Sequence, residues 1–169
     1  MVNLWSALAS RDTRLLKAQL DALHALPDNC WFVNYLRCHD DIGWGLDYPT
    51  LKSWGLEEIS HKRYLNDFFT GKVQGSVSRG ELYNDDPVTM DARFCGTTAS
   101  MCGIESALYE KDANKLEEAV RTDLMLHAYM LVQSGIPMLY SGDEVGQLND
   151  YTYKENPSKA VDSRYLHRG

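Results

Sequence analysis

The stretch FVNYLRCHDDIGW, residues Phe32–Trp44, is apolar in its first half and turns abruptly acidic in its second. A strand with one face in water alternates apolar and polar side chains, whereas Trp31–Leu36 is aromatic or aliphatic almost throughout. Such a run is typical of a strand buried on both faces, as in a parallel sheet. The stretch therefore predicts a buried strand with His39, Asp40 and Asp41 at its carboxyl end.

Two helix-then-strand units are predicted along the chain. In the first, leucines at helical spacing predict a helix over Leu4–Leu26, which Pro27 ends just before the strand described above. In the second, Asp112 and Asn114 are candidate caps for a helix that extends to about Ser134, and a short apolar strand is predicted over Ile136–Ser141. Each unit ends in a short apolar strand that is followed by carboxylates.

The segment between the two units, residues 42–111, is too long to be a simple connection. Loops between a strand and the next helix in α/β units usually have about two to six residues. The segment is therefore expected to carry its own structure, including a short amphipathic helix around His61–Thr70. The predicted organisation is residues 1–41, an inserted segment 42–111, and residues 112–169.

Composition and charge narrow the class of protein. The 169 residues are 44% hydrophobic and 24% charged, which is ordinary for a globular domain. A formal net charge of −7 and a pI near 5.1 argue against a nucleic-acid partner, and no apolar run approaches the ~18 residues of a membrane span. The chain starts without a signal-peptide pattern and its four cysteines lack C-x-x-C spacing, so reduced thiols and a cytoplasmic location are expected.

Carboxylates gather at the predicted carboxyl ends of both strands. In open α/β sheets and in (β/α) barrels this is the edge at which ligands bind. Carboxylates there suit carbohydrate chemistry, because they bond sugar hydroxyls and stabilise an oxocarbenium-like transition state. Asp143 and Glu144, which follow the second strand, are expected to brace the site by hydrogen bonds rather than to touch sugar.

Two other interpretations of His39, Asp40 and Asp41 remain open at this point. The aspartates could cap a loop or a helix. Histidine and carboxylates could also bind a metal ion, but the other histidines are scattered and neither a second ligand pair nor a calcium-loop spacing is visible. We therefore expect neither a metal nor a cofactor.

Three segments together resemble the α-amylase superfamily, glycoside hydrolase family 13, in the form found in amylosucrases. Val33–Trp44 is similar to the family's fourth conserved region, Gly135–Gly146 to its eighth-strand motif, and Val161–Arg168 to a segment of amylosucrases. The segments occur in the family's order, and the first predicted helix fits its sixth barrel helix. The resemblance implies an α/β fold: the C-terminal part of a (β/α)8 TIM barrel, from about helix 6 to strand 8, with a long insertion after strand 7.

The resemblance also implies roles for single residues. Asp40 matches the carboxylate that stabilises the transition state without attacking the sugar, and His39 matches the histidine that bonds the glucosyl ring in the −1 subsite. Asp41 matches an aspartate that lines the donor pocket. Arg164 matches the arginine that pairs with an acidic residue from an earlier loop and closes the base of that pocket. Within the inserted segment, Arg93 matches an acceptor-binding arginine.

The activity implied is that of a retaining glycoside hydrolase or glucosyltransferase acting on sucrose or an α-glucan. The family's nucleophile and acid/base come from earlier strands, so this chain alone is expected to be inactive and, with strands left unpaired, to self-associate. Lys62 stands where amylosucrases carry a second acceptor arginine, so hydrolysis or transfer to a short acceptor could replace polymer elongation. Two different functions stay open beside this one: an amylase or α-glucosidase type of hydrolase, and a non-catalytic carbohydrate-binding module.

Overall fold

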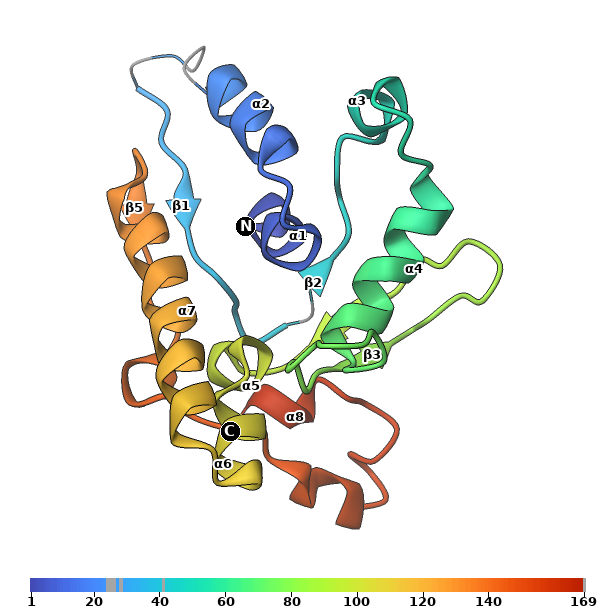
Figure 1. The fold of residues 1–169 in the computed structure, drawn as a ribbon, viewed down its shortest axis with the longest axis vertical. Helices are drawn as coiled ribbons and strands as arrows, with labels where there is room; N and C mark the ends of the chain where they lie inside the picture. The colour runs from blue at the N-terminus through green and yellow to red at the C-terminus, as the bar shows by residue number, and fades with distance from the viewer. Residues whose placement is uncertain (24–26, 28, 41, 169) are drawn as a thin grey trace.

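The computed structural model describes residues 1–23, 27, 29–40 and 42–168, and Figure 1 shows their arrangement. The α-helices are α1 (Val2–Ser10), α2 (Arg14–Leu23), α3 (Tyr48–Ser53), α4 (Glu58–Phe69), α5 (Thr98–Cys102), α6 (Ile104–Glu110), α7 (Ala113–Val132) and α8 (Tyr165–Arg168). The strands are β1 (Val33–Asn34), β2 (Ile42–Gly43), β3 (Glu81–Tyr83), β4 (Arg93–Cys95) and β5 (Ile136–Pro137). Two short 3-10 helices, η1 (Asp143–Val145) and η2 (Tyr151–Glu155), lie between β5 and α8.

The expectation of a C-terminal TIM-barrel fragment is wrong. The described residues form a small mixed domain rich in helices, whose five short strands belong to two small sheets and enclose no barrel. A barrel strand has a hydrogen-bonded neighbour on each side. Here β1 and β5 have only each other, and each is two residues long.

The two-stranded sheet is parallel, with Val33 opposite Ile136. Gly135 leads into β5 with a φ of 130°, and a Cβ there would lie 2.5 Å from the carbonyl oxygen of Phe32, so only glycine permits this approach. The predicted burial on both faces is wrong, because the Trp31 side chain is 73% exposed and Ile136 is 54% exposed. The second strand also stops after two residues, well short of the predicted length.

The helix predicted over Leu4–Leu26 is interrupted. Helix α1 ends where Arg11 takes a left-handed conformation with a φ of 55°. Asp12 then accepts a hydrogen bond from the backbone N–H of Arg14 at 3.0 Å, which starts α2. A side chain that captures a backbone N–H in this way competes with the helical hydrogen bond and starts a new helix instead.

The two other predicted helices are confirmed. Asp112 caps α7 by accepting from the backbone N–H groups of Asn114 and Lys115 at 3.0 and 3.1 Å. Helix α4, Glu58–Phe69, coincides with the amphipathic helix expected in the inserted segment. In Figure 1, α7 runs along the β1–β5 sheet, whereas α4 lies on the other side of α1.

An aromatic cluster forms the centre of the core. The Phe69 ring lies 4.7 Å from that of Phe94 and meets Trp5 edge-on at 5.6 Å. Trp44 stacks against both phenylalanines at 5.7 Å. The indole N–H of Trp5 donates to the carbonyl of Leu36 at 2.9 Å. These contacts tie α1, α4 and β4 to the segment that follows β1.

The three-stranded sheet β2–β4–β3 is antiparallel and lies within the inserted segment. Gly43 of β2 and Tyr83 of β3 both pair with Arg93 of the central strand. Because β2 begins soon after Asp40, this sheet continues directly from the acidic end of the opening stretch.

Neither a disulfide nor a membrane-spanning helix is found among the residues that the structure describes. The four cysteines are not joined in disulfides within this part of the chain, as expected from their spacing. Of the helices described, none combines the length and the apolar character needed to cross a lipid bilayer.

An apolar surface is left exposed on α7 and on the β1–β5 sheet. The exposed side chains on it are Trp31, Phe32, Val33, Leu124, Met125, Leu131, Val132, Ile136, Met138 and Leu139. Exposed apolar side chains of this kind, next to open strand edges, are typical of a region that contacts another protein chain.

We predict that the chain self-associates through this surface. Light scattering over a concentration series should give a mass that rises with concentration. The double change Leu124→Glu and Val132→Glu should shift the protein toward the monomer, because it places two charges on the apolar surface. Val88→Glu, in the exposed β3–β4 connection, serves as the control. A monomeric mass at every concentration would contradict the prediction.

Candidate functional site

The structure brings Asp40 and Arg164 together. Asp40 lies between β1 and β2, whereas Arg164 precedes α8 by one residue, 124 positions later in the chain. Nη1 of Arg164 donates to Oδ1 of Asp40 at 3.1 Å. The resemblance places both residues around one sugar pocket but gives Arg164 an acidic partner from an earlier loop, so its contact with Asp40 is a new observation.

Arg164 is held in place from two other sides. Its Nε and Nη2 atoms donate to the two carboxylate oxygens of Asp162, both at 2.8 Å. Its guanidinium group lies 4.6 Å from the centre of the Tyr83 ring. The hydrogen bonds to Asp162, and then the one to Asp40, raise the pKa of Arg164 above its usual value, so this guanidinium is always charged.

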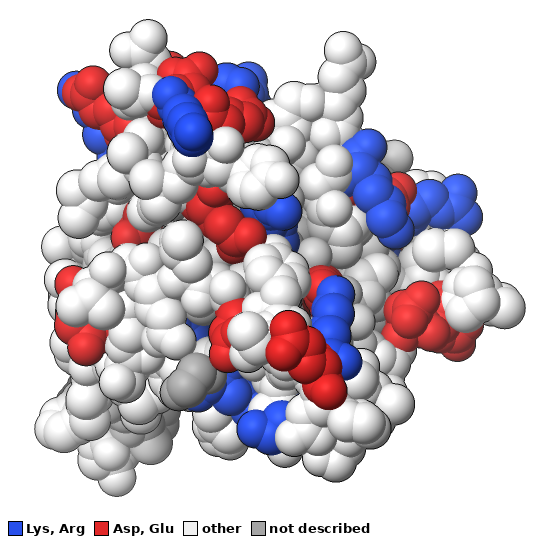
Figure 2. Space-filling model, turned by 90° about the horizontal axis from the view of Figure 1, so that it is seen from below, with Lys and Arg blue, Asp and Glu red and all other residues white. Residues whose placement is uncertain are grey.

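A second arginine, Arg168, reaches the same carboxylate. Its Nη2 lies 3.5 Å from Oδ1 of Asp40, and its Nε donates to the backbone carbonyl of His39 at 2.7 Å. Arg168 therefore fixes the backbone next to Asp40, while the side chain of His39 is exposed to solvent. On the face seen from below, acidic and basic side chains lie next to one another at several places (Figure 2).

Arg93 lies at the adjoining end of the three-stranded sheet. It is in register with Tyr83, whose ring supports Arg164, and its Nη1 atom lies 3.2 Å from the position that a Cβ on Gly43 would occupy. The inserted segment thus contributes Tyr83 next to Arg164, with Arg93 on the neighbouring strand. Asp41, the remaining predicted site residue, lies outside the described residues.

The Asp40 carboxylate remains accessible. Its side chain is 48% exposed, and those of Arg164 and Arg168 are partly exposed. Ion pairs in contact with water contribute little to stability and exchange partners easily. A carboxylate beside guanidinium groups can accept a hydrogen bond from one hydroxyl of a ligand. An arginine can at the same time donate a hydrogen bond to the adjacent hydroxyl of that ligand. The arrangement therefore suits a neutral ligand that is rich in hydroxyl groups.

No protein-family model matches this chain. The resemblance to the α-amylase superfamily accordingly stays a prediction that rests on the quoted motifs.

A buried ion pair lies behind this site. Arg37 is 1% exposed, and its Nε donates to Oδ1 of Asp143 at 2.7 Å. Thr98 donates to the other carboxylate oxygen at 3.2 Å, and the Tyr140 ring lies 4.4 Å from the Arg37 guanidinium. The expectation that Asp143 braces the structure by hydrogen bonds is confirmed. Arg37 was missed, although an arginine inside a run that is otherwise apolar is a signal for a buried charge with a partner.

Arg37 also positions the helix that delivers the surface arginines. Its Nη1 donates to the backbone carbonyl of His167 at 3.1 Å. His167 in turn accepts from the backbone N–H of Gly96 through Nδ1, also at 3.1 Å. Helix α8 is therefore held between Arg37 and the end of β4, and Arg164 and Arg168 lie on either side of this anchor point.

Burial and the charges of this pair shift the pKa values of neighbouring groups. Burial, followed by the positive charge of Arg37, lowers the pKa of His167 to about 4. His127 lies 3.8 Å from Asp143, whose carboxylate is the main cause of a raised pKa for that histidine. Burial raises the pKa of Asp123, which lies one turn before His127 on α7. His167 is therefore neutral at physiological pH, as its acceptor role requires.

We predict that Arg37→Met strongly destabilises the protein. The change leaves the carboxylate of Asp143 buried without its main partner, which costs about 3–5 kcal/mol in comparable cases. The double change Arg37→Met and Asp143→Leu should recover part of this loss, because it removes the unpaired charge as well. Chemical denaturation measures both effects. An equal loss in the single and double variants would show that the ion pair is not the cause.

We also predict that stability falls as the pH drops from about 6.5 to about 4. The unfolded chain protonates His167 near its ordinary pKa of about 6.5, whereas the folded protein binds that proton only near pH 4. The free energy of unfolding should therefore decrease by about 3 kcal/mol across this window on account of His167. His167→Asn should flatten the pH dependence and His39→Asn, at an exposed histidine, should not. Thermal melts at several pH values test this difference.

Proposed function

We propose that this chain binds saccharides at Asp40 and acts in glycoside hydrolysis or glucosyl transfer of the retaining, amylosucrase-like type. In this proposal Asp40 stabilises the positive charge that develops on the sugar ring, and Arg164 and Arg93 contact sugar hydroxyls. The substrate is sucrose or an α-glucan. The chain alone binds sugar without converting it, because the resemblance places the nucleophile and the acid/base in segments that this sequence does not contain.

The hydrogen bond between Arg164 and Asp40 is the observation that carries the proposal. The two residues come from separate motif segments and meet at 3.1 Å. The Tyr83 ring, from the inserted segment, lies against Arg164, and Arg93 is the strand partner of Tyr83. Asp40 and Arg164, which the resemblance places around one pocket, are thus brought together from two distant parts of the chain, and this supports the proposal.

Asp40 is suited to both steps that the proposal needs. Its half-exposed carboxylate can accept hydrogen bonds from sugar hydroxyls in the ground state. When a hydroxyl replaces an arginine as its partner, the freed negative charge interacts more strongly with a cationic ring than with a neutral one. This difference is the definition of transition-state stabilisation.

A non-catalytic carbohydrate-binding role is the second candidate. The contacts of Arg164 and Arg168 with Asp40 favour it, because two guanidinium groups offset the negative charge that catalysis would use. The same groups offer alternating donors and acceptors to neutral hydroxyls. Binding without chemistry therefore requires less rearrangement of the site than catalysis does.

Titration calorimetry with sucrose and maltotriose tests the binding step. We predict that Asp40→Asn and Arg164→Ala each weaken saccharide binding at this site by between about tenfold and about a hundredfold, since a charge-assisted hydrogen bond contributes roughly 1.5–3 kcal/mol. Asp21→Asn is a matched control, because Asp21 is also an exposed aspartate near a basic side chain, Lys17, in α2. Unchanged affinity in both site variants would contradict the proposal.

Turnover separates the two candidates. In a protein that joins this chain to the nucleophile and acid/base segments, Asp40→Asn should lower kcat about a hundredfold or more, by analogy with other groups that stabilise a developing charge. Saccharide binding that is retained with normal kcat would exclude the catalytic role. Binding without any turnover of sucrose or maltotriose would support the carbohydrate-binding role.

A further inference from the structure

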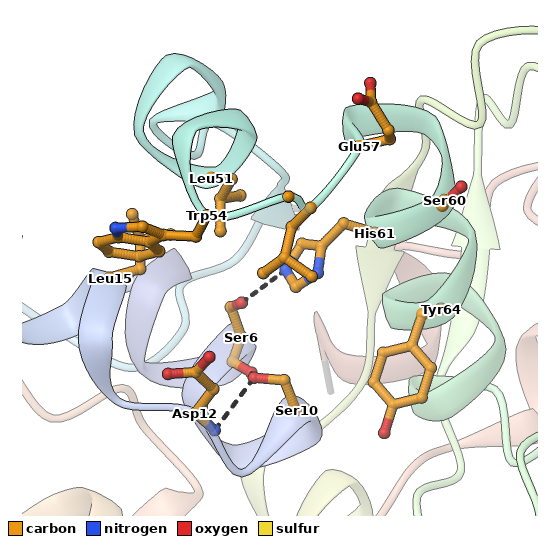
Figure 3. A pocket seen from close by; sticks show the side chains of 12 residues that line it. Ser6, Ser10, Asp12, Leu15, Leu51, Trp54, Glu57, Ser60, His61 and Tyr64 are labelled. Atoms are coloured by element: carbon orange, nitrogen blue, oxygen red, sulfur yellow. Dashed lines mark hydrogen bonds between the residues drawn. The ribbon is translucent and has the colours of Figure 1, made fainter.

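A cavity of about 420 Å³ lies between the α1–α2 helices and the α3–α4 helices. This volume falls in the range that small-molecule sites usually have. Figure 3 shows Ser6 and Asp12 on one wall, His61 on the opposite wall, and Trp54 near Leu15 at one end. The residues around the cavity include none of those that surround Asp40.

The walls of the cavity are fixed by contacts between the two helix pairs. The hydroxyl of Ser6 and Nε2 of His61 are hydrogen-bonded at 3.0 Å, and both residues are buried. The Tyr64 hydroxyl donates to the carbonyl of Ala9 at 2.7 Å. These two bonds join α1 to α4, so the cavity is held open at a defined width.

A third contact holds the aromatic end of the cavity. The guanidinium group of Arg14 lies 4.9 Å from the centre of the Trp54 ring. The same group donates to both carboxylate oxygens of Asp12, at 2.6 to 3.0 Å. Arg14, which is not itself part of the lining, therefore connects Asp12 to Trp54 and positions α2 relative to α3.

The side chains that line the cavity are acidic or neutral, which favours a neutral ligand over an anion. Asp12 and Glu57 contribute carboxylates, and no lysine or arginine is among the described residues that line the cavity. Burial lowers the pKa of His61, so its ring is neutral at physiological pH. A neutral imidazole offers one donor and one acceptor, which suits hydroxyl groups. Leu15, Trp54 and the neighbouring leucines supply an apolar wall beside these polar groups.

We propose that this cavity is a second saccharide site, in which a neutral sugar packs its C–H face against Trp54 and Leu15 and directs hydroxyls toward His61 and Asp12. A sugar ring combines an apolar face with a rim of hydroxyl groups, as this lining demands. The choice of a saccharide among neutral polyols rests on the proposed function. The cavity itself is independent of Asp40, so a longer saccharide or a second molecule can be bound apart from the first site.

Nuclear magnetic resonance of the whole chain during titration with maltotriose tests the proposal. We expect the imidazole signals of His61 and the indole N–H signal of Trp54 to shift as the sugar is added. Trp54→Ala should weaken this binding at least tenfold, and Trp54→Phe should retain most of it. Trp31→Ala is the matched control, because Trp31 is exposed on the approach to β1 and lies outside the cavity. Thermal melts of each variant check that it is folded.

The two saccharide sites can fail separately in this experiment. Asp40→Asn should leave the shifts of His61 and Trp54 unchanged. Shifts confined to the surroundings of Asp40 would overturn the cavity proposal and leave the proposed function standing. Shifts confined to the cavity would support the cavity proposal and contradict saccharide binding at Asp40. Equal losses in Trp54→Ala and Trp31→Ala, or tighter binding of an organic cation such as putrescine than of maltotriose, would also overturn the cavity proposal.

Discussion

The ion pair between Arg37 and Asp143 is the contact on which the arrangement of this protein depends. It joins the segment after β1 to the segment after β5, and it holds α8 through the carbonyl of His167. Two charges so deeply buried are tolerated only when each has a close partner. Since the two-residue strands β1 and β5 contribute few hydrogen bonds, this pair is what keeps their carboxyl ends together.

Local patterns in the sequence predicted the helices better than the sheets. Helix α7 has an aspartate cap and a long amphipathic repeat, so both its start and its extent follow from nearby residues. The first helix is interrupted because Asp12 captures the N–H of Arg14, a contact that hydrophobic spacing does not reveal. The burial of Trp31–Leu36 was overestimated for a different reason. An apolar run indicates that a strand can be buried if other elements cover it. Among the described residues, β5 is the only strand paired with β1.

The candidate site was predictable only in part. The resemblance named Asp40 and Arg164, and the structure brings those two into contact. It did not name Arg168 or Tyr83, whose positions depend on how α8 docks on the three-stranded sheet. No spacing in the sequence encodes that docking, because it follows from the buried bond between Arg37 and the backbone of His167. Long-range contacts of this kind have to be seen in the folded chain.

The burial of the two arginine–aspartate contacts explains why one serves the fold and the other suits a ligand. Arg37 and Asp143 are shielded from water, so separating them would expose each charge to an apolar interior. Arg164 and Asp40 are in contact with water, so either can exchange its partner for a ligand hydroxyl at little cost. The buried pair fixes α8 in space, and α8 then presents the exchangeable arginine beside Asp40. The rigid buried pair thus allows the contact between Arg164 and Asp40 to open for a ligand without displacing α8.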